Sequence, residues 1–220
     1  FNELEIDDII DGIKKKLLNI EHDFIQNDVT KIEKANSNIK DIIEAAQKGI
    51  DIGLPVQGDI LNEVIAGARL GTLVVRSAGS GTGKTRQAVG DACLLAYPTR
   101  YDSITGEWVQ CGSCEKVLFI ATEQTTEEIK KMILAYLTGF NESKFRYGHF
   151  SKEEDRIIRQ AERVMEIYED NFYIVQMPSP RIDLIKNLVR EQVLLYNIQY
   201  VFYDYIFISP SLLTEFRGVS

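Results

Sequence analysis

The eight residues from Ala78 to Thr85, Ala-Gly-Ser-Gly-Thr-Gly-Lys-Thr, set the narrowest limit on the structure of this chain. They lie between an apolar run, Thr72-Leu73-Val74-Val75, and a helical pattern that extends to about Tyr97. Glycines at alternate positions let the backbone curl so that successive N–H groups point inward, and the start of a helix adds positive potential. A strand, a glycine-rich loop and a helix in this order are typical of a phosphate-binding site in an α/β domain.

The residues of this loop differ in what they are expected to bind. The backbone N–H groups should bind phosphate oxygens. Lys84 should reach the β- and γ-phosphates of a nucleotide, and the Thr85 hydroxyl should ligate Mg²⁺. Alanine in place of glycine at the first position still permits the turn, because its side chain is small. The residues predicted to bind nucleotide are Ala78, Gly79, Ser80, Gly81, Thr82, Gly83, Lys84 and Thr85.

Strand-like and helical segments alternate after the loop. Strands are predicted at 117–121, 172–175 and 200–208, and helices at 127–137, 151–169 and 183–196. This alternation predicts a parallel sheet with helices on both faces. The segment from Pro98 to Glu115 interrupts it and is typical of a β-hairpin that turns at Thr105-Gly106. Within it, Cys111-Gly112-Ser113-Cys114 offers two of the four ligands that a structural zinc needs, so a tight hairpin end is favoured over a metal site.

Residues 1–52 are predicted to form a helical region, and residues 53–220 the α/β core. One apolar stripe runs from Ile6 to Phe24 and a second from Val29 to Ala46, both at helical spacing. Asp28 or Thr30 is expected to cap the second helix, with Glu33 at capping-box spacing from Thr30, and Gly49 to end it. The stripes fit a helical hairpin packed on the core or a helix that docks on a neighbouring subunit, and periodicity alone does not separate the two.

Two acidic residues are candidates for chemistry on a bound nucleotide. Asp204 lies in the apolar run 200–206, where a lone buried charge is costly, so a cation-bound partner such as a Mg²⁺-linked water is expected. A strand-end aspartate that reaches solvent is the alternative. Glu123 follows the apolar run 117–121, at the strand end where ligand sites of α/β proteins form. It is the candidate general base, with Gln124 and Glu127 as nearby competitors.

These features together resemble the ATPase domain of DnaB-type replicative DNA helicases, which has a RecA-like P-loop NTPase core. The resemblance runs from about residue 6 to 210. It rests on the Walker A loop beginning with Ala78, on the Glu123 strand end, and on Asp204-Tyr205 of the Walker B strand. The turn Gly53-Leu54-Pro55 and the segment Phe145-Arg146-Tyr147-Gly148 before a helix at Ser151 also match.

The resemblance implies ATP and Mg²⁺ as cofactors, a homo-hexameric ring, and translocation on single-stranded DNA. It also implies a linker helix around Asp8 to Glu21 that docks on the adjacent subunit, and possible helicase-loader and primase partners. The Pro98 to Glu115 hairpin departs from the family pattern, where this connection is short. DNA contacts and an arginine finger from the neighbour are expected beyond residue 220, because the chain is read as a fragment that ends soon after Asp204. On that reading, this piece alone is expected to bind nucleotide with negligible turnover.

Composition excludes several other classes. The chain carries 25 Lys and Arg against 33 Asp and Glu, a formal net charge of −8, which argues against nucleic-acid binding through bulk charge. Three cysteines are not a secretory disulfide framework and fit reduced thiols in a cytoplasm. No apolar stretch approaches the roughly 18 residues of a membrane span, so no membrane partner is expected. The alternatives to a helicase are another RecA-like ATPase, such as a recombinase or a KaiC-like protein, and a nucleotide-binding assembly module without turnover.

Overall fold

The computed structural model describes residues 34–49 and 52–205. The chain divides into two compact units, residues 1–50 and residues 51–220. The described part of the first unit contains one helix, α2 (Ile39–Gln47), whose side chains Ile39, Ile42 and Ile43 are exposed. The first stripe, from Ile6 to Phe24, lies outside the described residues, so the prediction of a docking helix there stays a prediction.

Helix α2 begins later than the sequence predicted. Its N-cap is Asn38, in the left-handed conformation with φ 57°, and residues 35–38 form turns. Asparagine and serine hydrogen-bond readily to nearby backbone groups, which favours turns over helix at positions 36–38. The predicted caps Asp28, Thr30 and Glu33 lie outside the described residues. Gly49 follows the helix as predicted, and its N–H donates to the Ala46 carbonyl at 3.1 Å.

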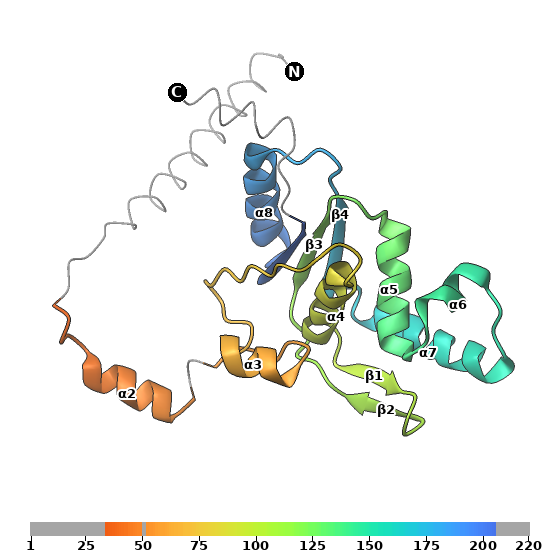
Figure 1. Ribbon diagram of the computed structural model, residues 1–220, viewed down its shortest axis with the longest axis horizontal. Coiled ribbons are helices and arrows are strands. Elements are labelled where there is room, and N and C mark those ends of the chain that lie inside the picture. The colour runs from red at the N-terminus through yellow and green to blue at the C-terminus, as the bar shows by residue number, and fades with distance from the viewer. Residues whose placement is uncertain (1–33, 50–51, 206–220) are drawn as a thin grey trace, which may run out of the picture. The chain divides into compact units, whose positions relative to one another are not determined.

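A three-stranded parallel sheet forms the centre of the second unit (Figure 1). Its strands are β3 (Val117–Ala121), β4 (Phe172–Gln176) and β5 (Tyr200–Asp204), in the order β4-β3-β5. The register places Ala121 beside both Gln176 and Asp204, so the three strands end at the same edge. All five residues of β3 are buried, which explains its uninterrupted apolar sequence.

Helices cover both faces of this sheet, as the alternating pattern predicted. Alternate side chains of a strand point to opposite faces. Val117, Phe119 and Ala121 accordingly pack in one core with α4 (Lys84–Ala96), α5 (Thr126–Thr138) and α7 (Lys152–Ile167). Leu118 and Ile120 pack in a second core with α8 (Ile182–Tyr196). The α/β class and the parallel sheet are therefore confirmed.

Capping residues set the boundaries of several helices. Thr125 and Ser151 begin α5 and α7 with capping boxes completed by Glu128 and Glu154, and the box at Ser151 was predicted. Helix α7 ends at Ile167 and is followed by a short 3-10 helix, η1 (Glu169–Asn171). The described part of the unit also contains two shorter helices, α3 (Asp59–Ile65) and α6 (Glu142–Tyr147), and α6 was not predicted.

The predicted strand over Thr72 to Val75 is absent. Residues 72–79 have no regular secondary structure and no strand partner, and Leu73 and Val75 are 88% and 66% exposed. A β-strand forms only where a neighbouring strand supplies hydrogen bonds. Among the described strands, β5 pairs with β3 alone, so it supplies none to residues 72–75. Side chains fix this segment instead. The Thr72 hydroxyl donates to the Arg69 carbonyl at 2.8 Å, and Arg76 pairs with Asp91 of α4.

The segment between α4 and β3 forms the predicted hairpin. Strands β1 (Thr99–Asp102) and β2 (Glu107–Gln110) pair antiparallel around a turn that contains Gly106, at φ 76°. The hairpin returns against the end of α4 at Gly112, where an added Cβ would lie 1.9 Å from the Tyr97 carbonyl oxygen. Only glycine fits such a close approach, which gives the glycine between the two cysteines a packing role. Among the described helices, none is long and apolar enough to cross a membrane.

Candidate functional site

The glycine-rich loop curls immediately before α4. Gly81 and Gly83 have φ of 74° and 90°, backbone conformations that side chains rarely adopt. The Thr82 hydroxyl donates to the Gly79 carbonyl at 2.8 Å and closes the turn. The Lys84 ammonium donates to the carbonyls of Ala78 and Gly79, both at 2.9 Å, so its side chain lies along the loop. These contacts hold the loop in a ring-like turn at the positive end of α4.

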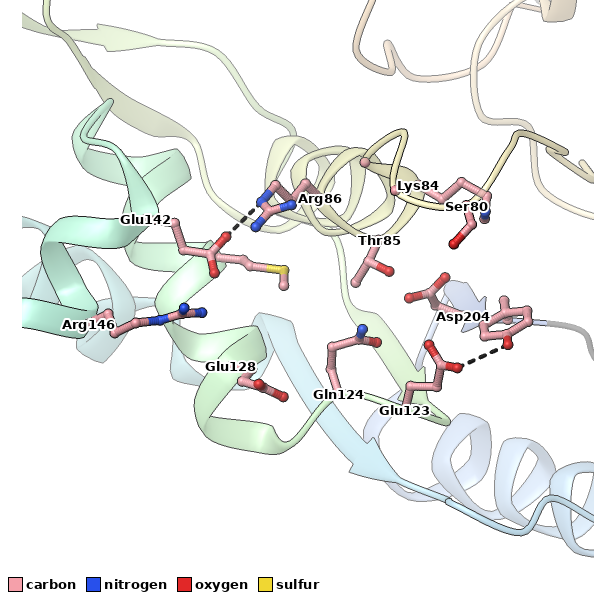
Figure 2. A pocket seen from close by; sticks show the side chains of 14 residues that line it. Ser80, Lys84, Thr85, Arg86, Glu123, Gln124, Glu128, Glu142, Arg146 and Asp204 are labelled. Atoms are coloured by element: carbon pink, nitrogen blue, oxygen red, sulfur yellow. Dashed lines mark hydrogen bonds and ion pairs between the residues drawn. The ribbon is translucent and has the colours of Figure 1, made fainter.

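A cavity of about 500 Å³ lies beside this loop, at the carboxyl ends of β3 and β5 (Figure 2). Figure 2 shows Thr85, Glu123 and Asp204 turned toward the same space from three different elements. Ala78, Gly79 and Thr82 shape the loop without lining the cavity. The predicted site residues that line it are Ser80, Gly81, Gly83, Lys84, Thr85, Glu123 and Asp204.

Asp204 is a buried carboxylate at the end of β5. It is 6% exposed, and its Oδ2 has no hydrogen-bond partner among the described residues. The alternative of a strand-end aspartate that simply reaches solvent is therefore wrong. A buried carboxylate oxygen without a donor is costly, and here it borders a cavity that also contains the Thr85 hydroxyl. This pairing suits a divalent cation that takes few protein ligands and completes its shell with water and phosphate.

Glu123 lies two residues beyond β3 and is exposed. Its Oε1 accepts a hydrogen bond from the Tyr205 hydroxyl at 3.0 Å, and this bond raises the pKa of Tyr205 above its ordinary value. Thr122, between β3 and Glu123, is buried and bonds to the end of β5. The tertiary structure thus brings Glu123 and Tyr205 together across 82 positions of sequence.

The structure also separates the competitors for the role of base. Glu127 does not line the cavity, whereas Gln124 and Glu128 do. Glu128 is engaged in the capping box of α5, because its carboxylate accepts from the Thr125 N–H at 2.9 Å. Gln124 carries no charge, so it is not a general base, but its Oε1 is buried without a partner among the described residues. Of Glu123 and its three neighbours, only Glu123 is a carboxylate that lines the cavity and takes no part in a helix cap.

Two arginines that line the cavity were not predicted from the sequence. Arg86 and Arg146 also line the cavity, and Arg86 pairs with Glu142 of α6 at 2.7 Å. Arg86 directly follows Thr85, and Arg146 belongs to a segment that the sequence singled out only for its resemblance. Arg86 and Glu142 lie 56 positions apart in the sequence, and their contact depends on the packing of α4, α5 and α6, which no local pattern predicts.

A buried carboxylate anchors the start of the loop and was also missed. Asp91 of α4 is fully buried, accepts from the Gln57 N–H at 2.7 Å, and pairs with Arg76, two residues before Ala78. Burial raises the pKa of Asp91, while the Gln57 N–H and the Arg76 guanidinium act in the opposite direction. Asp91 lies on the buried face of α4 among apolar residues. A charged residue in such a pattern was the sequence feature from which a buried ion pair could have been predicted.

Comparison with known proteins matches one family model, and the similar proteins include a prophage protein and a plasmid helicase. The family described as "DnaB-like helicase C terminal domain" matches residues 53–214. The SPbeta prophage-derived uncharacterized protein YorI of Bacillus subtilis is 28% identical over 215 residues, covering 98% of this chain and 42% of that protein. The "Probable plasmid replicative DNA helicase" of Chlamydia trachomatis is 28% identical over 147 residues, covering 67% of this chain and 29% of that protein. The chain thus spans less than half the length of these relatives.

Proposed function

The chain belongs to the DnaB-like helicase C-terminal domain family, and from this premise we propose that it is the ATPase core of a replicative DNA helicase. In this role it binds and hydrolyses ATP, translocates on single-stranded DNA and separates duplex strands. One observation carries the proposal. Lys84 and Thr85 at the start of α4, Glu123 after β3 and Asp204 at the end of β5 line a single cavity of about 500 Å³.

Nucleotide binding would use the loop and the start of α4. Backbone N–H groups around Ser80, Gly81 and Gly83 bind the phosphate oxygens, with the positive end of α4 behind them. The Lys84 ammonium exchanges its two loop carbonyls for the β- and γ-phosphates, which are stronger acceptors because they are charged. The loop is preformed, so binding requires little ordering of the backbone.

Mg²⁺ fits the donors present at the cavity. The Thr85 hydroxyl and the buried Asp204 carboxylate would hold it, Asp204 directly or through a water. When bound with ATP, the cation neutralises charge on the β- and γ-phosphates. In the described residues no cluster of three or more His, Cys, Asp or Glu side chains could form a metal site.

Glu123 would activate the attacking water. One Glu123 oxygen takes a proton from the water as the water oxygen bonds to the γ-phosphorus. The bond between the γ-phosphorus and the β,γ-bridging oxygen breaks, and the products are ADP and inorganic phosphate. Glu123 then releases its proton to solvent, which it reaches because the residue is exposed. Each turnover therefore returns Glu123 to its ionised state.

The larger assembly is proposed from family membership. We place residues 1–52 as a linker and docking region and residues 53–220 as the RecA-like ATPase core. ATP would bind between subunits of a homo-hexameric ring in the cytoplasm, where an arginine from the neighbour stabilises the transferring phosphoryl group, an effect worth roughly 10³-fold or more in rate. A helicase loader and a primase are the expected protein partners.

The decisive experiment compares the intact protein with Lys84→Ala and Glu123→Gln. Calorimetry with Mg·ATP should show that the wild type and Glu123→Gln bind the nucleotide and that Lys84→Ala does not. An ATPase assay should show that Glu123→Gln abolishes turnover. Lys130→Ala is the matched control, because Lys130 is exposed on α5 and does not line the cavity. Equal nucleotide affinity in wild type and Lys84→Ala would refute the assigned site.

DNA separates the remaining possibilities. A helicase should hydrolyse ATP faster with single-stranded DNA and should displace a labelled strand from a forked duplex. ATP hydrolysis without strand displacement would favour another RecA-like ATPase. Binding of nucleotide without hydrolysis in the intact protein would instead favour an assembly module.

A further inference from the structure

The Glu123 carboxylate is held by a tyrosine from the neighbouring strand. Tyr205 directly follows β5, and its hydroxyl donates to Oε1 of Glu123 at 3.0 Å. The dashed line that starts at the labelled Glu123 in Figure 2 marks this bond. Glu123 is exposed and Tyr205 is half-buried. An exposed glutamate has several rotamers of similar energy. A hydrogen bond from a neighbour selects one of them.

The backbone around this pair is fixed by Thr122. The Thr122 N–H and hydroxyl both donate to the Asp204 carbonyl, at 2.9 and 3.1 Å, and the Tyr205 N–H donates to the Thr122 hydroxyl oxygen at 3.2 Å. Thr122 is 5% exposed, so water does not compete strongly for these bonds. The residues on either side of the contact, Glu123 and Tyr205, are therefore held at a defined separation at the edge of the sheet.

We propose that Tyr205 is a positioning residue for the base, which holds one carboxylate oxygen of Glu123 so that the other takes the proton of the attacking water. This inference rests on the proposed function. The tyrosine hydroxyl is a donor at neutral pH, and an ionised carboxylate is the acceptor that it prefers. Oε1 is engaged by Tyr205, and Oε2 accepts the proton. Small errors in the placement of a reacting group greatly lower the reaction rate. A Glu123 carboxylate held in one position therefore favours proton transfer.

The test is the steady-state kinetics of Tyr205→Phe in the intact protein with Mg·ATP and single-stranded DNA. This variant removes the hydroxyl and keeps the ring. We expect kcat to fall roughly tenfold, with the KM for ATP and the Kd for ADP unchanged. Tyr203→Phe is the matched control, because Tyr203 lies on the same strand, its ring packs in the core beside α8, and its hydroxyl makes no hydrogen bond within the described part of the chain. It should leave kcat unchanged.

A second pair of variants guards against a merely structural effect. Glu123→Asp shortens the side chain by one methylene and withdraws the carboxylate from Tyr205. Adding Tyr205→Phe to it should cost no further rate if the two side chains act as a unit. Thr122→Val, which removes the hydroxyl that holds Tyr205, should lower kcat in the same direction as Tyr205→Phe.

The outcomes distinguish this inference from the function beneath it. If the wild type hydrolyses ATP and the kcat of Tyr205→Phe is unchanged or increased, the proposed role of Tyr205 is overturned and the helicase proposal is left intact. A fall in kcat that is equally large in the Glu123→Asp background would also overturn it. Absence of turnover in the wild type, with retained binding, would overturn the proposed hydrolysis and this inference with it.

Discussion

Replacing Arg76 with methionine should destabilise the protein, because it leaves the carboxylate of Asp91 buried with one donor. Asp91 is fully buried in α4 and has two partners, the Gln57 N–H at 2.7 Å and the Arg76 guanidinium. Methionine keeps much of the apolar stem of arginine, so the change isolates the charge. The perturbation therefore acts on one ion pair and its hydrogen bond.

The expected cost follows from the burial of the pair. Breaking a fully buried ion pair costs about 3–5 kcal/mol, and a hydrogen bond to a charged group contributes about 1.5–3 kcal/mol. The Arg76 side chain is 33% exposed, so solvent screening lowers the cost to about 2 kcal/mol. For a unit of the size of residues 51–220 this corresponds to a fall in Tm of about 4–8 °C.

The pH dependence gives the loss a specific signature. Burial raises the pKa of Asp91 in the folded state, and Arg76 opposes that rise. Without Arg76 the folded-state pKa of Asp91 rises further. An ionised Asp91 therefore lowers the stability of the variant, and protonation of the carboxyl removes this loss. The loss of stability relative to wild type should be full above the folded-state pKa of Asp91 in the variant, shrink as pH falls through that pKa, and vanish below the folded-state pKa of Asp91 in the wild type, which is itself raised above 3.8.

Urea denaturation of the nucleotide-free protein at several pH values provides the measurement. Arg159→Met is the control, because Arg159 pairs with Asp155 on an exposed face of α7 and should cost no more than about 0.5 kcal/mol. Adding Asp91→Asn to Arg76→Met should recover most of the lost stability, since no charge is then buried. A loss in Arg76→Met that is independent of pH, or no larger than that of the control, would refute the reasoning.

Three further predictions concern the metal, a helix start and the core. Asp204→Asn should weaken the Mg²⁺ dependence of ATP binding while binding of metal-free ATP persists, as calorimetry with and without EDTA would show. Glu154→Gln keeps the capping box but removes a charge whose pKa is lowered by hydrogen bonds from Lys144 and the Ser151 N–H. Its destabilisation should be present above about pH 4.5 and disappear as pH falls through the lowered pKa, as thermal melts at pH 7 and pH 3 would show. Phe119→Ala should cost about 3–5 kcal/mol in urea denaturation, because this fully buried ring stacks between two others at 6.2 and 6.3 Å.

Much of the fold follows from local sequence patterns, and these elements could be predicted from the sequence alone. The apolar runs at 117–121 and 172–175, the capping box at Ser151 and the turn at Gly106 each specify their own conformation, and each is present as predicted. The helical stretch after Thr85 and the α/β alternation have the same origin. Periodicity and capping act over a few residues, so they can be evaluated without knowing what packs against them.

The failures arose where the conformation depends on a distant partner. The run Thr72 to Val75 has the composition of a strand, but a strand requires a neighbour that pairs with it, and among the described residues none does. Helix α2 begins at Ile39 because the asparagine and serine residues before it form turns, which the apolar stripe did not reveal.

The site shows the same division. The residue types around Lys84, Glu123 and Asp204 were recognisable in the sequence, because their chemistry depends on side-chain identity and on position at the end of a strand. Only the tertiary structure decided that Asp204 is buried with an oxygen that lacks a partner, and that Tyr205 bonds to Glu123. Both facts depend on the register between β3 and β5, whose residues lie about 80 positions apart in the chain. Contact across such a separation is set by the packing of the whole domain, which no local pattern encodes.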